Sequence, residues 1–288
     1  GTTLPRPRAR PIVARIVTAS GSRLLIAGGA ALPLPKSGDP RLGDAVICQL
    51  DGTTADCNDA KAVMVAARAN AATLCLDATA LGCRRLLIFG GRLSKSAPLA
   101  EIYDATKDTF EAVELGQGFV PESVHGGALV AVKGGAALLL GATANALFLD
   151  PAATTDPKAV EPLRIEIDES TSPTRLTLAK IDLGAFAGTD AGRRALSTVV
   201  GLGDGGLLYV GGLDDKGAIV SDAIRFDADG LPVARVALEV ARYGAASATA
   251  GTGLFTGCAM IFGGFSEAKA GGADVALAHT EIFCPSAK

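Results

Sequence analysis

Four arginines recur along the chain and form the polar set with the clearest possible chemistry. Arg8, Arg68, Arg194 and Arg242 each stand shortly before a strand-like run. Guanidinium groups bind carboxylate, sulfate or phosphate through paired hydrogen bonds, so a group of four would suit an anion. The same side chains could instead donate to loop carbonyls and tie the repeats together, which is the role that recurrence favours. The cationic residues of two neighbouring loops complete the candidate ligand-binding set: Arg41, Arg92 and Lys95.

The six cysteines fall into three local pairs. Cys48 and Cys57 are placed symmetrically about the turn at residues 51–54, so a hairpin puts them opposite each other. Cys75 and Cys83 flank a second turn in the same way. Cys258 begins one strand-like run and Cys284 ends the next, and antiparallel pairing would bring those ends together. We therefore predict three disulfides and an extracellular, periplasmic or cell-surface location, against the alternative of six reduced thiols.

Three motifs suggest a cofactor or an ion, and each has a simpler explanation. Residues 201–206 match G-x-G-x-x-G, but a strand-like run follows where a dinucleotide site needs a helix. Residues 227–230 and 214–217 resemble the start of a calcium loop without the remaining oxygen ligands. We interpret all three as turns. The cysteines do not show the CxxC spacing that is typical of a metal site. We therefore predict neither a metal nor a cofactor.

Classical catalytic residues are sparse. The chain has two histidines, His125 and His279, and no Gly-x-Ser-x-Gly motif or Ser-His-Asp order. One local acidic cluster consists of Glu161, Glu166, Asp168 and Glu169, and solvated strand ends explain it. A hydrolytic mechanism would therefore depend on carboxylates alone.

The composition limits the class of protein that positions these residues. Of 288 residues, 36 are Gly and none is Trp, while 49% are hydrophobic. The net charge of -3 argues against a general nucleic-acid binder. No apolar run is long enough for a membrane span. These features indicate a turn-rich protein whose core consists of small aliphatic side chains.

Internal repeats organise the whole chain. A short aliphatic run that ends in glycine occurs five times, about 50 to 70 residues apart, at residues 24–29, 86–91, 137–141, 207–212 and 259–264. Each run follows another strand-like segment and precedes a third, at 44–48, 101–104, 146–150, 223–227 and 280–283. A fourth strand follows in at least two copies, at 109–113 and 231–236. Four short strands per repeat predict an all-β propeller with antiparallel blades, five in number, with six as the alternative.

The paired glycines, the aromatic-plus-Asp ending of the third strand and the recurring arginines resemble the kelch-repeat β-propeller family, in its bacterial secreted type. The resemblance covers nearly the whole chain. It departs from the family in lacking Trp, and the third repeat has Ala142 in place of the second glycine. Some kelch proteins are copper oxidases whose site resembles two His, two Tyr and a Cys joined to one Tyr. Tyr103, Tyr209 and Tyr243 are present here, but every Cys already has a local partner, so we expect no copper site.

We expect a single kelch-like domain over residues 1–288. Its blade cores cover about 8–60, 68–115, 124–167, 194–238 and 242–288, with an insertion at about 168–189. Residues 1–4 would supply the strand that closes the last blade and removes its open edge. Membership of a larger multidomain chain is a further expectation.

The loops after the glycine pairs, at residues 30–43, 92–99 and 265–279, differ most in length and composition. Such loops on a rigid scaffold form a typical interaction surface. We therefore predict a non-enzymatic extracellular binding or scaffold domain with a protein or glycan partner. The alternatives are an enzyme acting on an anionic sugar at the channel mouth and a structural spacer in a surface assembly.

Overall fold

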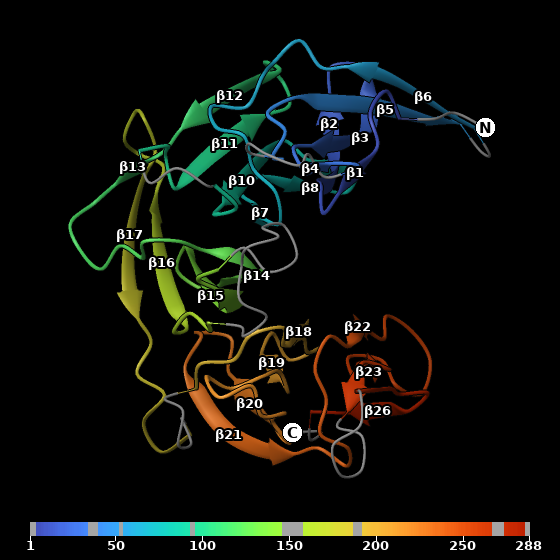
Figure 1. Ribbon diagram of the computed structural model, residues 1–288, viewed down its shortest axis with the longest axis vertical. Coiled ribbons are helices and arrows are strands. Elements are labelled where there is room, and N and C mark those ends of the chain that lie inside the picture. Colours follow the sequence, from blue (N-terminus) through green and yellow to red (C-terminus); the bar gives the residue numbers. More distant parts are fainter. Residues whose placement is uncertain are drawn as a thin grey trace. The chain divides into compact units, whose positions relative to one another are not determined.

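The computed structural model describes residues 4–33, 40–51, 54–92, 96–145, 158–186, 192–266 and 274–285. The chain separates into two compact units. Unit 1 comprises residues 1–126, 145–153 and 168–176, and unit 2 comprises 127–144, 154–167 and 177–288. Each unit is considered by itself below (Figure 1).

Unit 1 contains the first two blades. Blade 1 is formed by β2 (Ile12–Thr18), β3 (Gly21–Ala27), β5 (Ala45–Asp51) and β6 (Thr54–Asp59), in the order β6-β5-β3-β2. Blade 2 is formed by β7 (Ala72–Cys75), β10 (Arg85–Phe89), β11 (Ala100–Asp104) and β12 (Thr109–Ala112). A small hairpin of β8 (Ala78–Thr79) and β9 (Gly82–Cys83) joins the blade 1 sheet through Ile16 of β2. A separate two-stranded sheet pairs β1 (Arg8–Ala9) with β4 (Ala30–Ala31).

Unit 2 contains the last two blades. Blade 4 is formed by β18 (Thr198–Gly201), β19 (Leu207–Val210), β20 (Asp222–Phe226) and β21 (Pro232–Ala237). Blade 5 has three strands within the described part of the chain: β22 (Ala246–Thr249), β23 (Ala259–Phe262) and β26 (Thr280–Phe283). The short strands β24 (Phe265–Ser266) and β25 (Val275–Ala276) pair with each other.

Blade 3 differs from the prediction in its outer strands. Its first two strands are β14 (His125–Val132) and β15 (Ala136–Thr143), as expected. The third is β16 (Leu163–Asp168), paired with β15, and the fourth is β17 (Arg175–Lys180). The predicted third strand at 146–150 lies outside the described residues. The predicted insertion at 168–189 is wrong for residues 175–180, because those residues form the fourth strand, beside the short β13 (Glu114–Leu115).

The strand that pairs with β15 has a different hydrophobic pattern from the one predicted for a third strand. Residues 146–150 copy the aromatic-plus-Asp ending of the other third strands. The strands that the structure describes here alternate between buried and more exposed positions: Leu163 and Ile165 are fully buried in β16, and Leu176 and Leu178 are buried in β17. Alternation is typical of a strand with one covered and one solvated face. The extra length of this repeat therefore precedes the third strand.

The structure is an all-β five-bladed propeller of mostly antiparallel four-stranded sheets, as predicted. The described residues contain one 3₁₀ turn, at Gly184–Phe186, and no α-helix. Aliphatic side chains supply most of the packing. Ile16, Leu25 and Ile88 are fully buried between blades 1 and 2, and Leu138, Leu207 and Ile224 are buried in unit 2. Aliphatic side chains therefore make up most of the described core in each unit.

The predicted closure of the last blade involves residues 1–4, of which 1–3 lie outside the described part of the chain. Leu4 packs against Ile26, Val46 and Cys48 in unit 1. Closure by this segment and the assignment of residues 1–288 to one domain therefore stay predictions.

Candidate functional site

The paired glycines end the second strand of four blades, and backbone geometry requires them there. Gly28 and Gly29 have φ angles of 60° and 96°, in the left-handed region that favours glycine. A Cβ on Gly28 would lie 2.5 Å from the carbonyl oxygen of Arg68, and the amide of Gly29 donates to that oxygen at 2.7 Å. Equivalent bonds join Gly91 to Val124 and Gly212 to Arg242. Gly29, Gly91 and Gly212 therefore each link their own blade to the start of the following repeat through the backbone.

We call the four recurring arginines the clamp arginines, and three of them, Arg8, Arg68 and Arg242, contact both ends of the loop that follows the glycine pair of their own blade. In blade 1, Nη1 of Arg8 donates to the carbonyl of Gly28 at 2.8 Å, where the loop begins. The same atom lies 3.4 Å from the carbonyl of Asp44, where the loop ends, and Nη2 pairs with the Asp44 carboxylate at 3.0 Å. One side chain thus connects the two ends of a variable segment.

Blade 2 shows the most complete clamp. Nη1 of Arg68 donates to the carbonyls of Gly90 at 2.6 Å and Leu99 at 3.1 Å, and Nη2 donates to Pro98 at 2.7 Å. Its Nε pairs with the carboxylate of Glu101, and both side chains are 0% exposed. Burial raises the pKa of Glu101, and the charge of Arg68 opposes that rise.

In unit 2, Arg242 repeats the two-ended arrangement, and Arg194 contacts the end of its loop at Asp222. Nη1 of Arg242 donates to the carbonyls of Gly263 at 3.0 Å and His279 at 3.3 Å, and Nη2 pairs with Glu281. Arg194 donates to the backbone carbonyl of Asp222 at 3.0 Å and pairs with its carboxylate at 2.5 Å. Its guanidinium also lies 5.3 Å from the centre of the Tyr209 ring, within cation–π range.

These contacts favour a structural role for the clamp arginines over anion binding. All four side chains are buried, and each pairs with an acidic residue at the start of the third strand of its own blade. The side chains tie parts of one blade together rather than neighbouring blades, since the glycine amides make the bonds between blades. The acidic partners Asp44, Glu101, Asp222 and Glu281 recur as regularly as the arginines, and that recurrence was the sequence signal for their role.

The remaining cationic candidates lie near the clamp of blade 2. Arg41 Nε donates to the carbonyl of Gly91 at 3.0 Å, and Arg92 Nη1 donates to the carbonyl of Ala97. Burial lowers the pKa of Arg92, and the charge of Arg68 lowers it further. Both Arg41 and Arg92 are buried. Lys95 lies outside the described residues.

His125 shares this part of unit 1. It is buried, with its Nε2 atom 2.8 Å from the hydroxyl oxygen of Ser123. Burial lowers its pKa to about 4, and the charge of Arg41 adds to the effect. Arg68 thus lies close enough to Arg92, and Arg41 close enough to His125, for its charge to lower the pKa of that neighbour.

The three predicted disulfides are present, and the described residues contain no free cysteine. Cys48 and Cys57 lie directly opposite each other in β5 and β6, as the hairpin symmetry predicts. Cys258 and Cys284 adjoin the paired residues Ala259 and Phe283. The bond between Cys75 and Cys83 connects two sheets, because β9 belongs to the blade 1 sheet.

The glycine and aspartate motifs are turns, as interpreted. Residues 202–206 connect β18 to β19 through a bond from the Leu202 amide to the Gly206 carbonyl at 2.7 Å. The Asp227 carboxylate accepts from the amides of Asp229 and Leu231, and Asp214 accepts from Lys216 and Ala218. These carboxylates cap their own turns. No group of three His, Cys, Asp or Glu suited to a metal ion occurs among the residues that the structure describes.

The acidic cluster is distributed over separate contacts. Glu161 pairs with Lys180 at 2.5 Å and Glu166 with Arg164 at 2.6 Å. Glu169 pairs with Arg85, and Asp168 accepts from the Ser170 hydroxyl at 2.6 Å.

The hydroxyl groups of the three tyrosines each donate to an oxygen of the protein. Tyr103 donates to Asp108, Tyr209 to the Arg194 carbonyl and Tyr243 to Asp274.

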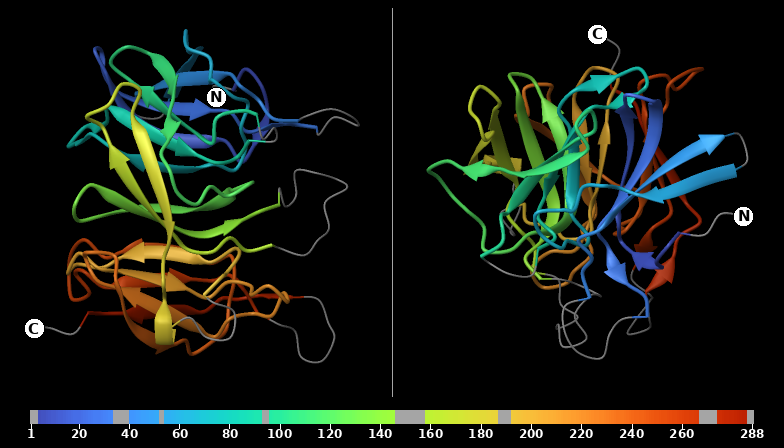
Figure 2. Two further views of the ribbon diagram at one scale, coloured as in Figure 1. Left: turned by 90° about the vertical axis from the view of Figure 1, so that its left-hand side faces the viewer. Right: turned by 90° about the horizontal axis from the view of Figure 1, so that it is seen from above.

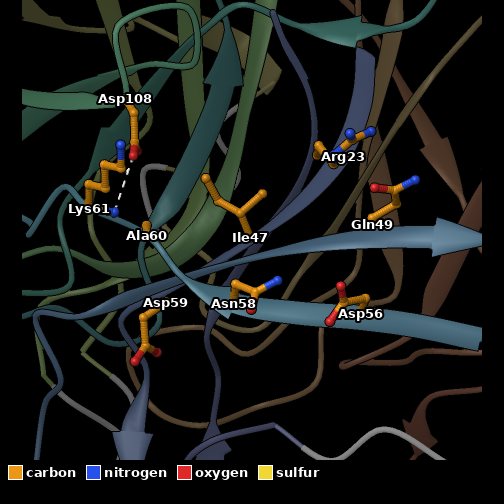
Figure 3. A pocket seen from close by; sticks show the side chains of 9 residues that line it. All are labelled: Arg23, Ile47, Gln49, Asp56, Asn58, Asp59, Ala60, Lys61 and Asp108. Carbon is orange, nitrogen blue, oxygen red and sulfur yellow. Dashed lines mark hydrogen bonds between the residues drawn. The ribbon is translucent and has the colours of Figure 1, made fainter. Parts of the chain in front are cut away.

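A cavity of about 250 Å³ lies in unit 1 at the β5–β6 hairpin, and sequence reasoning did not identify it. It is lined by Arg23, Ile47, Gln49, Asp56, Asn58, Asp59, Ala60, Lys61 and Asp108. Figure 3 shows Arg23, Gln49 and Asp56 near one end, Lys61 and Asp108 at the other, and Ile47 between them. The sequence signal was the alternation of polar residues along residues 47–49 and 56–58, which resembles an ordinary solvated strand face.

The comparisons with known proteins bear on the fold. No protein-family model and no curated protein sequence matches the chain. The solved structure of YjhT is similar, with a TM-score of 0.53 and 13% identity over 91% of this chain and 74% of that one. A novel fungal alcohol oxidase of the AA5 family, in complex with copper, gives a TM-score of 0.46 and 15% identity. That match covers 96% of this chain and 62% of the oxidase, less than two thirds of its length. The likeness to YjhT concerns the fold alone, and it supports the β-propeller.

Proposed function

We propose that the chain is a non-enzymatic binding domain of the extracellular, periplasmic or cell-surface compartment. It presents the loops between the second and third strands of its blades to a protein or glycan partner. The single observation that supports this role most strongly is the clamp. Arg8, Arg68 and Arg242 each hold the first and last carbonyls of such a loop, whatever the loop's length.

A clamped loop can change its sequence while the scaffold beneath it keeps its geometry. The three loops differ in length, from residues 92–99 to residues 265–279. Binding loops on rigid scaffolds follow this principle, because the scaffold and not the loop carries the folding free energy. Residues 34–39, 93–95 and 267–273 of these loops lie outside the described part of the chain.

The disulfides support the proposed compartment. All three are local, and such bonds persist where the environment is oxidising. The described residues contain no helix with the length and apolar character needed to cross a membrane. The glycine pairs and the recurring arginines support membership of the kelch-repeat family as part of the same proposal.

An enzyme acting on an anionic sugar through the clamp arginines receives less support. Such an enzyme needs guanidinium groups that substrate can reach, and those of Arg68, Arg194 and Arg242 belong to side chains at most 1% exposed. Their charges are already matched by carboxylates of the same blade.

A binding screen tests the proposal. Wild type and a loop-replaced variant, in which residues 34–39, 93–95 and 267–273 become Gly-Ser segments of equal length, are screened on a glycan array and against surface-protein extracts. We expect specific binding by wild type and its loss in the variant, with an unchanged thermal midpoint. Equal binding by both proteins would refute recognition through these loops.

A further inference from the structure

The cavity beside the β5–β6 hairpin is built from matched rows of side chains. β5 and β6 pair Gln49 with Asp56 and Ile47 with Asn58, so these four side chains share one face of the sheet. The register of β3 against β5 places Arg23 next to Gln49 on that face. The lining therefore has an outer polar row, formed by Arg23, Gln49 and Asp56, and an inner row in which Asn58 lies beside the apolar Ile47.

The end of the cavity at Lys61 and Asp108 is fixed by contacts between blades 1 and 2. The Asp108 carboxylate accepts from the Lys61 amide at 3.1 Å, shown in Figure 3, and from the hydroxyl of Tyr103 at 3.0 Å. Tyr103 is fully buried and packs against Phe110, with ring centres 4.7 Å apart and ring planes tilted by 44°. Asp108 is thus held in place before any ligand arrives.

The hairpin itself is held by the disulfide between Cys48 and Cys57. These residues are paired next to the row of Gln49 and Asp56, so the bond fixes the register of the strands that carry the polar groups. Figure 2 shows the hairpin, in light blue, extending beyond the neighbouring strands of its sheet. Binding groups on rigid strands lose little conformational freedom when a ligand binds.

The charges of the lining indicate which ligands fit. Three carboxylates, of Asp56, Asp59 and Asp108, disfavour an anion, while the cations of Arg23 and Lys61 disfavour a further cation. Amide, carboxylate and guanidinium groups together provide donors and acceptors. A sugar hydroxyl both donates and accepts, so a neutral polyhydroxylated ring matches this mixture, with its C–H face on Ile47 and Ala60.

We propose that this cavity binds one neutral sugar residue, with Asp56, Asn58 and Gln49 as its main hydrogen-bonding partners. At about 250 Å³ it is smaller than the roughly 300–1,000 Å³ of pockets for drug-sized ligands, which suits a single ring. The inference rests on the proposed binding function and assigns it a second surface, separate from the loops.

The test is an NMR titration of ¹⁵N-labelled protein with the methyl glycosides of glucose, galactose, mannose and N-acetylglucosamine. N-acetylneuraminic acid and glucosamine serve as charged comparisons. We expect amide shifts confined to β5, β6 and the Asp108 turn with at least one neutral glycoside. The variant Asp56→Ala/Asn58→Ala should weaken that binding by roughly tenfold or more, because two hydrogen bonds are lost. Glu111→Ala is the control, since Glu111 is an exposed carboxylate on β12 that does not line the cavity.

Three results would overturn the inference: no shifts with any neutral glycoside, stronger binding of a charged sugar, or equal binding by wild type and the double variant. The loop-replaced variant separates this inference from the proposed function. Glycoside binding that survives loop replacement supports the cavity. Binding that is lost only on loop replacement refutes the cavity and leaves the proposed function intact.

Discussion

Replacing Arg68 with Met removes the central group of the blade 2 clamp and leaves a buried carboxylate without its cation. Arg68 donates to three carbonyls, at 2.6, 2.7 and 3.1 Å, and pairs with Glu101 where neither side chain is exposed. Removing one partner of a buried ion pair costs about 3–5 kcal/mol. Since a domain is stabilised by about 5–15 kcal/mol in total, Arg68→Met should bring the protein close to unfolding at 37 °C.

The pH dependence of this loss has a defined sign. Burial already raises the pKa of Glu101, and removal of Arg68 removes an influence that lowers it. A carboxyl whose pKa is higher in the folded than in the unfolded state destabilises the fold as the pH rises through the folded pKa. The deficit of Arg68→Met relative to wild type should therefore be larger at pH 8 than at pH 5.

Urea unfolding followed by circular dichroism measures the effect. The double variant Arg68→Met/Glu101→Leu should recover about 2 kcal/mol or more relative to the sum of the single changes, because no carboxylate is left buried. Arg15→Met, at an exposed arginine of β2, is the control and should change stability by about 0.5 kcal/mol or less. A loss below about 1 kcal/mol for Arg68→Met, or strict additivity in the double variant, would refute the clamp.

Three further predictions concern stability. Gly28→Ala should lower the free energy of unfolding in urea by more than about 2 kcal/mol, because φ is positive there and the new Cβ would lie 2.5 Å from a backbone oxygen. Gly134 also has a positive φ but faces open space, so Gly134→Ala should cost only about 1 kcal/mol. Equal costs for the two variants would contradict this prediction. Cys258→Ala/Cys284→Ala should lower stability by about 3–4 kcal/mol through the lost 26-residue cross-link, and an unchanged unfolding midpoint would contradict it. Folding lowers the pKa of His125 from 6.5 to about 4, so the free energy of unfolding should decrease as the pH falls between those values, by about 3 kcal/mol in total. In His125→Gln this part of the pH dependence of the unfolding free energy should vanish. An identical pH dependence in both proteins would show that His125 does not contribute.

The repeat pattern carried most of the fold. The glycine pairs were predictable because their positive φ angles and close backbone contacts exclude a side chain. Each repeat with this backbone geometry therefore requires glycine at the same positions. The Cys48–Cys57 pair followed from hairpin symmetry. Cys75 and Cys83 were also paired correctly, but they lie in strands of two different sheets and not in one hairpin. The third blade was predicted less well, because residues 146–150 copied the motif while the alternating Leu163 and Ile165 formed the strand.

The candidate sites were harder to predict because they depend on contacts between strands. A sequence shows that arginines recur, but only their hydrogen bonds show that Arg8 joins Gly28 to Asp44. The cavity was missed because Gln49 and Asn58 are ordinary exposed polar residues along their own strands. Their common face appears only when the register of β5 and β6 is known.

The proposed binding function is tested most directly by one affinity comparison. The affinity of a ligand identified in the screen is measured for wild type and for the loop-replaced protein at matched thermal midpoints. The account predicts that loop replacement weakens binding by at least tenfold while the clamped scaffold remains folded. Unchanged affinity in a folded loop-replaced protein would contradict it.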